Sequence, residues 1–208
     1  MNHDREGFRY RAGLFAAIVA AASATAAVKV DAQSSAVPRY AANHDLLLPG
    51  GFESWVFVGS NLGLSYSRET RAQTALETGR GERREFHNVY INPEAYAHFA
   101  ATGEFPVPTI LVMERFAAAD KEPNGILTAG MYDGDRVGLE VAVKNTARPD
   151  GKPTPWAYYD FTDRSDPSKP VASAPAFPDA SCQNCHREHA SRDNVWVQFY
   201  PVLRRLIK

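Results

Sequence analysis

Residues 109–114 have the sequence Thr109-Ile110-Leu111-Val112-Met113-Glu114, a largely apolar run with β-branched side chains that is typical of a β-strand. Strand alternation places the odd-numbered residues on one face and the even-numbered residues on the other, so both faces are expected to be partly buried. Four further runs have the same β-branched and aromatic character, at residues 55–59, 86–91, 137–144 and 156–161. These five runs predict a mainly β (α+β) fold, with a five-stranded antiparallel sheet and a few short helices.

One of these helices is predicted to start after Asn92. Asn92 suits the N-cap position and Pro93 the first turn, while Gly103 is suited to end the helix. Tyr96 and Phe99 lie three residues apart on one side of this helix. We therefore expect that side to pack on the sheet.

The run Cys182-Gln183-Asn184-Cys185-His186 has the Cys-x-x-Cys-His pattern of covalent c-type haem attachment. The spacing lets both thiols add to the haem vinyl groups as thioethers, and His186 then lies beneath the iron. A neutral imidazole nitrogen would be the axial ligand, while the other ring nitrogen donates to a backbone carbonyl. Both cysteines of the chain lie in this motif, which predicts one covalent haem c. The apolar residues 194–203 are expected to form a helix or helical turn that covers one haem face.

Three other interpretations of the cysteine pair are weaker. A redox Cys-x-x-Cys pair needs a thioredoxin-like context in which a strand leads into a helix, and the residues around Cys182 do not show it. A zinc site could use Cys182, Cys185 and His189, but the usual second pair of ligands is missing. A disulfide at this spacing would be strained and would close only a tiny loop. The haem interpretation is therefore preferred.

The first 32 residues are predicted to be a secretory signal peptide. Arg5, Arg9 and Arg11 precede an alanine-rich apolar run of about 17 residues, which is short for a membrane span. Cleavage after Ala32 would fit a small-x-small rule, and an uncleaved membrane anchor is the alternative. Residues 33–208 would then form one exported, periplasmic domain, of a size that allows a proper core.

The charge of the chain is close to balanced, with 23 Lys and Arg against 24 Asp and Glu. Without the predicted signal peptide the balance is weakly acidic, and haem propionates would add negative charge. Neither a nucleic-acid partner nor a strongly anionic membrane surface is therefore expected.

Three side chains on the predicted strands could border the haem. Met113 either fills the core, as methionine commonly does in irregular gaps, or binds the iron as a distal thioether ligand. His87 either donates a hydrogen bond to a bound ligand or is a half-buried histidine at the start of a strand. Glu140 is costly to bury alone, so it is expected to be exposed or paired, for instance with an arginine.

The chain resembles the cytochromes P460 over nearly all of residues 33–208. The resemblance is carried by residues 46–49, 55–59, 89–98, 102–105, 138–140, 156–159, 182–186 and 199–204, with the sequences LLLP, WVFVG, VYINPEAYAH, TGEF, GLE, WAYY, CQNCH and FYPVLR. Together these motifs are specific. A Cys-x-x-Cys-His motif that follows five strands also differs from the small helical cytochromes c, in which the motif usually comes early.

The resemblance implies a mainly antiparallel β fold, commonly a homodimer, that holds a five-coordinate haem with His186 as proximal ligand. Enzymes of this family oxidise hydroxylamine, with nitric oxide chemistry nearby, and carry a lysine bonded to a haem meso carbon. That lysine falls here on Met113, which cannot form such a bond, and the nearest lysine is Lys121. His87 falls where the cross-linked enzymes carry an arginine, and Ala180 where some active relatives carry a carboxylate.

A sister group, the β-type cytochromes c′, shares this fold without the cross-link and binds nitric oxide and carbon monoxide in an apolar pocket. Three functions are therefore considered: a redox enzyme acting on hydroxylamine, nitric oxide or peroxide, a gas-binding haem protein, and a six-coordinate electron carrier with Met113 or Met131 as sixth ligand. The candidates for the distal pocket are His87, Met113, Glu140 and Ala180. A small-molecule ligand and a periplasmic electron-transfer partner are the expected partners.

Overall fold

The computed structural model describes residues 36–64, 84–120, 129–145, 149, 151 and 155–207. These residues belong to one compact unit, Ser34–Lys208. The predicted signal peptide, residues 1–32, lies outside the described residues, so export stays a prediction. Lys121 lies outside the described residues as well. No helix within the described residues is long and apolar enough to cross a membrane.

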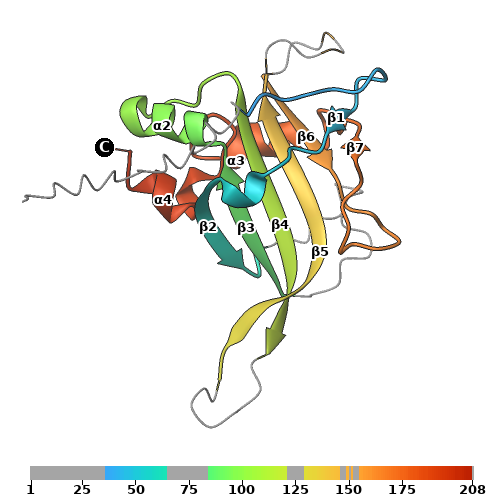
Figure 1. Cartoon of the computed structure of the whole chain (residues 1–208). Helices are drawn as coiled ribbons and strands as arrows, with labels where there is room; N and C mark the ends of the chain where they lie inside the picture. Colours follow the sequence, from blue (N-terminus) through green and yellow to red (C-terminus); the bar gives the residue numbers. More distant parts are fainter. Residues whose placement is uncertain are drawn as a thin grey trace, which may run out of the picture. The chain divides into compact units, whose positions relative to one another are not determined.

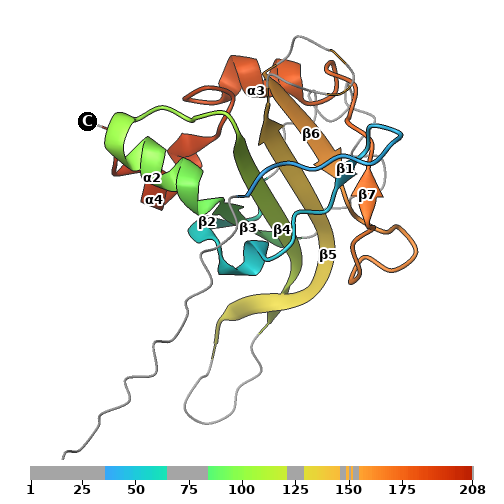
Figure 2. The same cartoon turned by 45° about the horizontal axis from the view of Figure 1, so that its top comes forward.

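Five antiparallel strands form the main sheet, side by side in chain order (Figure 1). They are β2 (Val56–Leu62), β3 (Glu85–Ile91), β4 (Thr109–Asp120), β5 (Met131–Lys144) and β6 (Trp156–Asp160). Each strand coincides with one of the five runs, which confirms the predicted five-stranded antiparallel sheet and the mainly β class. Two short strands, β1 (Leu46–Leu47) and β7 (Ser173–Ala174), pair with each other and lie next to β6 (Figures 1 and 2).

Strands β4 and β5 are longer than predicted because they continue beyond the sheet as a two-stranded arm (Figure 1). β3 pairs with β4 only as far as Glu85 and Ala117, whereas β4 and β5 remain paired as far as Asp120 and Met131. The register shifts on both sides of Phe116, where the ladder between β4 and β5 is irregular. Such irregularities bend and twist a strand pair, which directs the arm away from the sheet.

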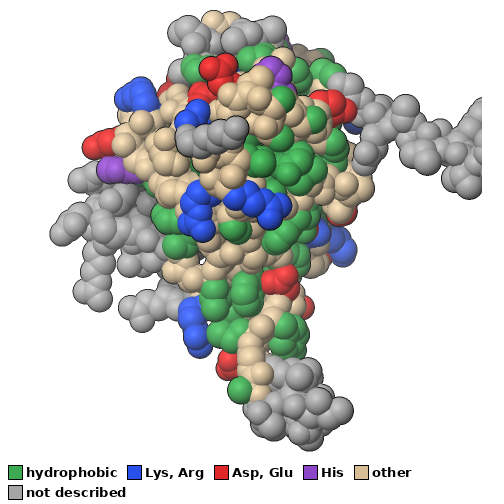
Figure 3. All heavy atoms as spheres, turned by 90° about the vertical axis from the view of Figure 1, so that its left-hand side faces the viewer, with side chains coloured by type: hydrophobic (Ala, Val, Ile, Leu, Met, Phe, Trp, Pro, Cys, Tyr) green, Lys and Arg blue, Asp and Glu red, His purple; other side chains and the backbone are tan. Residues whose placement is uncertain are grey.

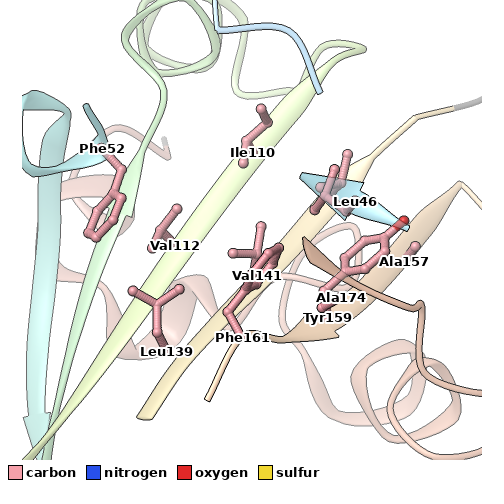
Figure 4. Close-up of a cluster of buried hydrophobic side chains, with 11 residues drawn as sticks. Leu46, Phe52, Ile110, Val112, Leu139, Val141, Ala157, Tyr159, Phe161 and Ala174 are labelled. Atoms are coloured by element: carbon pink, nitrogen blue, oxygen red, sulfur yellow. The ribbon is translucent and has the colours of Figure 1, made fainter. Parts of the chain in front are cut away.

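Residues of β4 alternate between two buried clusters on opposite faces of the sheet, as the alternation predicted. Ile110 and Val112 belong to a cluster formed with β5, β6 and the β1–β7 pair, which Figure 4 shows. Leu111 and Met113 belong to the other cluster, formed with helix α2 (Pro93–Thr102) and the C-terminal residues 195–207. The sheet thus has one face toward the β1–β7 pair and one face toward helix α2 and the C-terminal residues.

Helix α2 begins and ends where the sequence predicted, but its N-cap residue has a different role. The Asn92 side chain makes no capping hydrogen bond. Its Oδ1 instead accepts a hydrogen bond from the Ile110 backbone N–H at 2.8 Å, which ties the helix start to β4. Gly103 ends the helix with a φ of 75°, a left-handed conformation that favours glycine. Phe99 is buried in the cluster that also contains Leu111, and Tyr96 is partly buried against that cluster. This side of the helix therefore packs on the sheet, as predicted.

Residues 194–203, predicted to form a helix or helical turn, contain two short helices, because Pro201 cannot continue a helix that starts before it. They are the 3-10 turn η3 (Val197–Phe199) and the helix α4 (Pro201–Arg204), in which the proline takes the first helical position. Helix α4 packs against β2 (Figure 1). A Cβ at Gly59 in β2 would lie 2.9 Å from Pro201 Cδ, so this close approach requires glycine.

Strand β2 forms one edge of the sheet and carries apolar side chains at the surface. Phe57, Leu62 and the adjacent Leu64 are between 42% and 45% exposed. Figure 3 views this side of the molecule and shows hydrophobic surface among Lys and Arg side chains. The homodimer that the family resemblance implies stays a prediction.

Replacing Phe161 by alanine should lower the free energy of unfolding by about 3–5 kcal/mol, because the ring is fully buried in the cluster of Figure 4. Tyr132→Ala is the matched control, since Tyr132 is 53% exposed on the arm and its removal should change stability by about 0.5 kcal/mol or less. Urea unfolding followed by circular dichroism measures both values. Equal midpoints for the two variants would contradict the buried position of Phe161.

Candidate functional site

The Cys-x-x-Cys-His motif opens helix α3 (Gln183–His189), which contacts β6. Cys182 immediately precedes the first helical residue, and Cys185 and His186 follow within the first turn. Both cysteines are free thiols and partly buried. Ala180 is exposed in the turn before the helix and belongs to no strand, so it does not join the other three predicted distal residues on the sheet. One turn of helix therefore holds both thiols and the imidazole that the sequence predicted as haem-binding groups.

The His186 ring is oriented by contacts on several sides. Its Nδ1 lies 2.8 Å from the Asn194 carbonyl oxygen. The Tyr158 ring of β6 packs against it with centroids 4.5 Å apart, and the Trp196 ring meets it nearly edge-on at 5.2 Å. Burial lowers the pKa of His186, which favours the neutral imidazole. A neutral ring that donates from Nδ1 to the carbonyl keeps a lone pair on Nε2, the tautomer that binds a metal.

That lone pair on Nε2 already accepts a hydrogen bond. The Trp196 indole Nε1–H donates to His186 Nε2 at 3.2 Å, and the Trp196 ring stacks on Phe199 with centroids 5.9 Å apart. The indole N–H therefore occupies the direction in which an iron would bind. Ligation of a metal by Nε2 requires the Trp196 ring to turn away.

Both thiols are protonated at neutral pH. Burial is the main cause that raises the pKa of Cys182 to about 12, and the nearby carboxylates of Glu140 and Asp160 add to it. Burial also raises the pKa of Cys185. A reactive redox pair needs a lowered thiol pKa, so this environment does not favour that interpretation. Among the described residues no group of three or more His, Cys, Asp or Glu could hold a metal ion, so His189 does not complete a zinc site.

Three of the four predicted distal residues share one face of the sheet. His87 lies opposite Arg115, which is two residues from Met113, and Met113 lies opposite both Val89 and Glu140. Residues opposite each other in an antiparallel pair point to the same side. The register between β5 and β6 puts Tyr158, which contacts His186, on that side as well. His87, Met113 and Glu140 are therefore on the face against which the motif helix packs.

Arg115 is a buried cation on this face that the sequence did not indicate. It is only 3% exposed. Its Nη1 lies 3.0 Å from Glu85 Oε2 and its Nε lies 3.2 Å from Glu140 Oε1. His87 Nε2 is 3.9 Å from the same Glu85 oxygen. The predicted pairing of Glu140 with an arginine is confirmed, and Arg115 bridges the carboxylates of Glu85 and Glu140.

Gly138 provides the space for the Arg115 guanidinium. The two residues lie opposite each other in β4 and β5, and a Cβ at Gly138 would overlap the guanidinium nitrogens. Arg115 Nη2 also approaches the Val137 carbonyl oxygen at 3.4 Å. The strand period places Arg115 on the same face as Met113, but its contact with Gly138 depends on the pairing of β4 with β5, which the sequence does not show.

Gly138→Ala should displace the Arg115 guanidinium and lower the free energy of unfolding by about 1–3 kcal/mol, because the added methyl enters occupied space. Gly50→Ala is the matched control. A Cβ at Gly50 meets nothing within 4 Å, so this change should be neutral or stabilise by up to about 1 kcal/mol. Urea titration of both variants gives the comparison, and equal stabilities would contradict the position of Arg115.

A five-stranded antiparallel sheet with a Cys-x-x-Cys-His helix packed on one face defines a mainly β cytochrome, distinct from the small helical cytochromes c. The family model described as Cytochrome P460 matches residues 49–197, which is more than half of the chain. The chain therefore belongs to the cytochrome P460 family, as its motifs predicted. A comparison with curated proteins found no match.

Membership of this family implies a haem cofactor, and the residues of the motif fit one. Two free thiols lie at the spacing that haem attachment needs, and His186 has the tautomer that leaves Nε2 as the ligand. An iron bound by Nε2 would have to displace the Trp196 N–H.

Proposed function

We propose that this chain is an exported, periplasmic mono-haem c-type cytochrome of the P460 family with an open distal site for small nitrogen oxides. Cys182 and Cys185 would hold the haem as thioethers and His186 would be its axial ligand. The observation that carries the proposal is the hydrogen bond from His186 Nδ1 to the Asn194 carbonyl at 2.8 Å, beside two free thiols. This arrangement orients one imidazole nitrogen for a metal.

The haem would supply a redox-active iron that binds small ligands such as nitric oxide or hydroxylamine. The residues on the sheet face would form the surroundings of the site. Met113 packs with apolar side chains of the cluster that contains Leu111, helix α2 and the C-terminal residues, which supports a role in filling the core. The buried Arg115 compensates the charge of Glu140 and keeps that carboxylate in place. A periplasmic redox partner would exchange electrons with the haem.

A gas-binding protein of the β-type cytochrome c′ kind is the second candidate. The observation that favours it is Met113, which stands where the cross-linked enzymes carry a lysine and lies among apolar neighbours. A six-coordinate electron carrier has less support. Met131 is the first residue of β5 and pairs with Asp120 in the arm, beyond the point where Glu85 ends the pairing of β3 with β4, so it is poorly placed to be a ligand.

Optical and resonance Raman spectra of the purified protein, ferric and ferrous, test the coordination. With no side chain on the distal side, the ferrous iron should be high spin and should bind carbon monoxide or nitric oxide promptly. A low-spin spectrum in both oxidation states, lost in Met113→Ala but kept in Met131→Ala, would instead support the electron carrier.

A further inference from the structure

The turn that follows α3 contains two consecutive residues in the left-handed backbone region. Asp193 has a φ of 44° and Asn194 a φ of 61°. Asp and Asn adopt this region more readily than other residues besides glycine, and the contacts around the turn hold both of them there. Arg192 and Val195 close the turn, with the Val195 N–H donating to the Arg192 carbonyl at 2.7 Å. Contacts between this turn and the rest of the unit therefore decide its conformation.

The Asp193 carboxylate ties the turn to the sheet. Its Oδ2 accepts a hydrogen bond from Lys144 Nζ at 2.7 Å, and its Oδ1 accepts one from Trp156 Nε1 at 3.1 Å. Lys144 and Trp156 lie opposite each other in β5 and β6, so both donors come from one position of the sheet. Lys144 Nζ also donates to the Phe105 carbonyl at 2.7 Å, and Trp156 is fully buried. Both donors are thus held independently of the turn.

The residue after Asp193 carries the acceptor for the proposed haem ligand. The Asn194 carbonyl oxygen lies 2.8 Å from His186 Nδ1. A hydrogen bond from this nitrogen orients the ring and increases the basicity of the opposite nitrogen, Nε2. Because the carbonyl belongs to the strained turn, its position depends on what holds Asp193.

We propose that Asp193 is a positioning residue for the haem ligand. Held by Lys144 and Trp156, its carboxylate fixes the Asn194 carbonyl against His186 Nδ1 and thereby sets how strongly Nε2 donates electrons to the iron. The inference rests on the proposed function, because it needs His186 to be the axial ligand. Without the carboxylate the turn relaxes, the carbonyl withdraws, and the ferric state loses stabilisation relative to the ferrous state.

Asp193→Ala in the haem-loaded protein removes both contacts at once. The iron–histidine stretching band of the ferrous protein should move to lower frequency, and the reduction potential should become more positive. We expect the ferric-to-ferrous ratio at a fixed potential to fall about tenfold, which corresponds to a rise of about 59 mV in a one-electron reduction potential. Resonance Raman spectroscopy and a redox titration measure the two effects.

Asp163→Ala is the matched control, because Asp163 is a carboxylate whose hydrogen bonds go to Ser165 in a loop after β6. It should change neither the stretching frequency nor the potential. If Asp193→Ala gives the same two values as Asp163→Ala, the positioning role is wrong. A change in overall stability alone would not move the stretching frequency of the folded, haem-loaded protein.

Trp156→Phe keeps most of the buried ring and removes only the N–H that donates to Asp193. This variant provides the test of the proposal if Asp193→Ala fails to fold or to load haem. The stretching frequency and the potential should shift in the same directions by a smaller amount, and unchanged values would overturn the proposal. A failure of the proposed function is seen separately, because the unaltered protein would then contain no covalently bound haem.

Discussion

Haem-loaded protein unfolded in guanidinium chloride should keep its haem and should contain no titratable thiol. Both results follow if Cys182 and Cys185 are consumed as thioethers, because a haem held only by His186 would dissociate when the ligand geometry is lost. Mass spectrometry of the intact chain should show the mass of one haem added to the polypeptide. Without the two thioether bonds, the unfolded protein should lose all of its haem, so this is the largest effect that we expect.

Variants of helix α3 locate the attachment. The double variant Cys182→Ala, Cys185→Ala should lose all covalently bound haem. His189→Ala is the matched control, since His189 is exposed on the same helix and should leave the haem content unchanged. Haem that acidified acetone extracts from the unaltered protein would show that no thioether exists and would remove the basis of the proposed function.

Proteolysis of the haem-loaded protein should release haem on a single peptide, the one that contains Cys182 and Cys185. Its mass should equal the peptide plus unmodified haem, because Met113 has no amine to bond the ring. Distortion of the macrocycle is one of the means by which a protein tunes haem. Without the cross-link, the ferrous Soret band should be that of an ordinary c-type haem, and hydroxylamine oxidation should be slow or absent.

The lysines decide whether another cross-link could form. Lys144 is already engaged, since its Nζ lies 2.7 Å from both the Phe105 carbonyl oxygen and Asp193 Oδ2. Lys121 is the nearest lysine in the sequence, so Lys121→Met is the informative control and should leave the haem peptide and the spectrum unchanged. Haem joined to a second peptide containing either lysine would restore the cross-linked enzyme as the leading interpretation.

The main features of the fold could be predicted because they depend on local patterns. The alternation in β4 gave both the strand and its two buried faces, and the signals around Asn92 and Gly103 gave helix α2. The arm was missed because residues 117–120 and 131–136 are alanine, glycine and aspartate in large part, and these residues have little intrinsic preference for strands. The pairing of β1 with β7 joins segments too far apart for any local signal.

The candidate site could be predicted as far as the motif and the strand faces that approach it. Cys182, Cys185 and His186 are identified by their spacing, and Met113 by the family resemblance, while the strand period gives only the face on which Met113 lies. The contacts that hold them depend on the backbone. The carbonyl of Asn194 has no sequence signature, and a positive φ at Asp193 depends on contacts with residues far away in the chain. The hydrogen bond from Trp196 to His186 likewise depends on the folded backbone and has no signature in the sequence.

The division of the sheet into two faces has an evolutionary consequence. Ile110 and Val112 contribute to the apolar layer under the β1–β7 pair, whereas Met113 and Arg115 lie on the opposite face, which they share with Tyr158, a contact of His186. A substitution at an odd-numbered position of this strand can change the environment of the cofactor while the layer on the other side stays packed. Such a scaffold allows the residues on one face to be exchanged through a few replacements and without refolding.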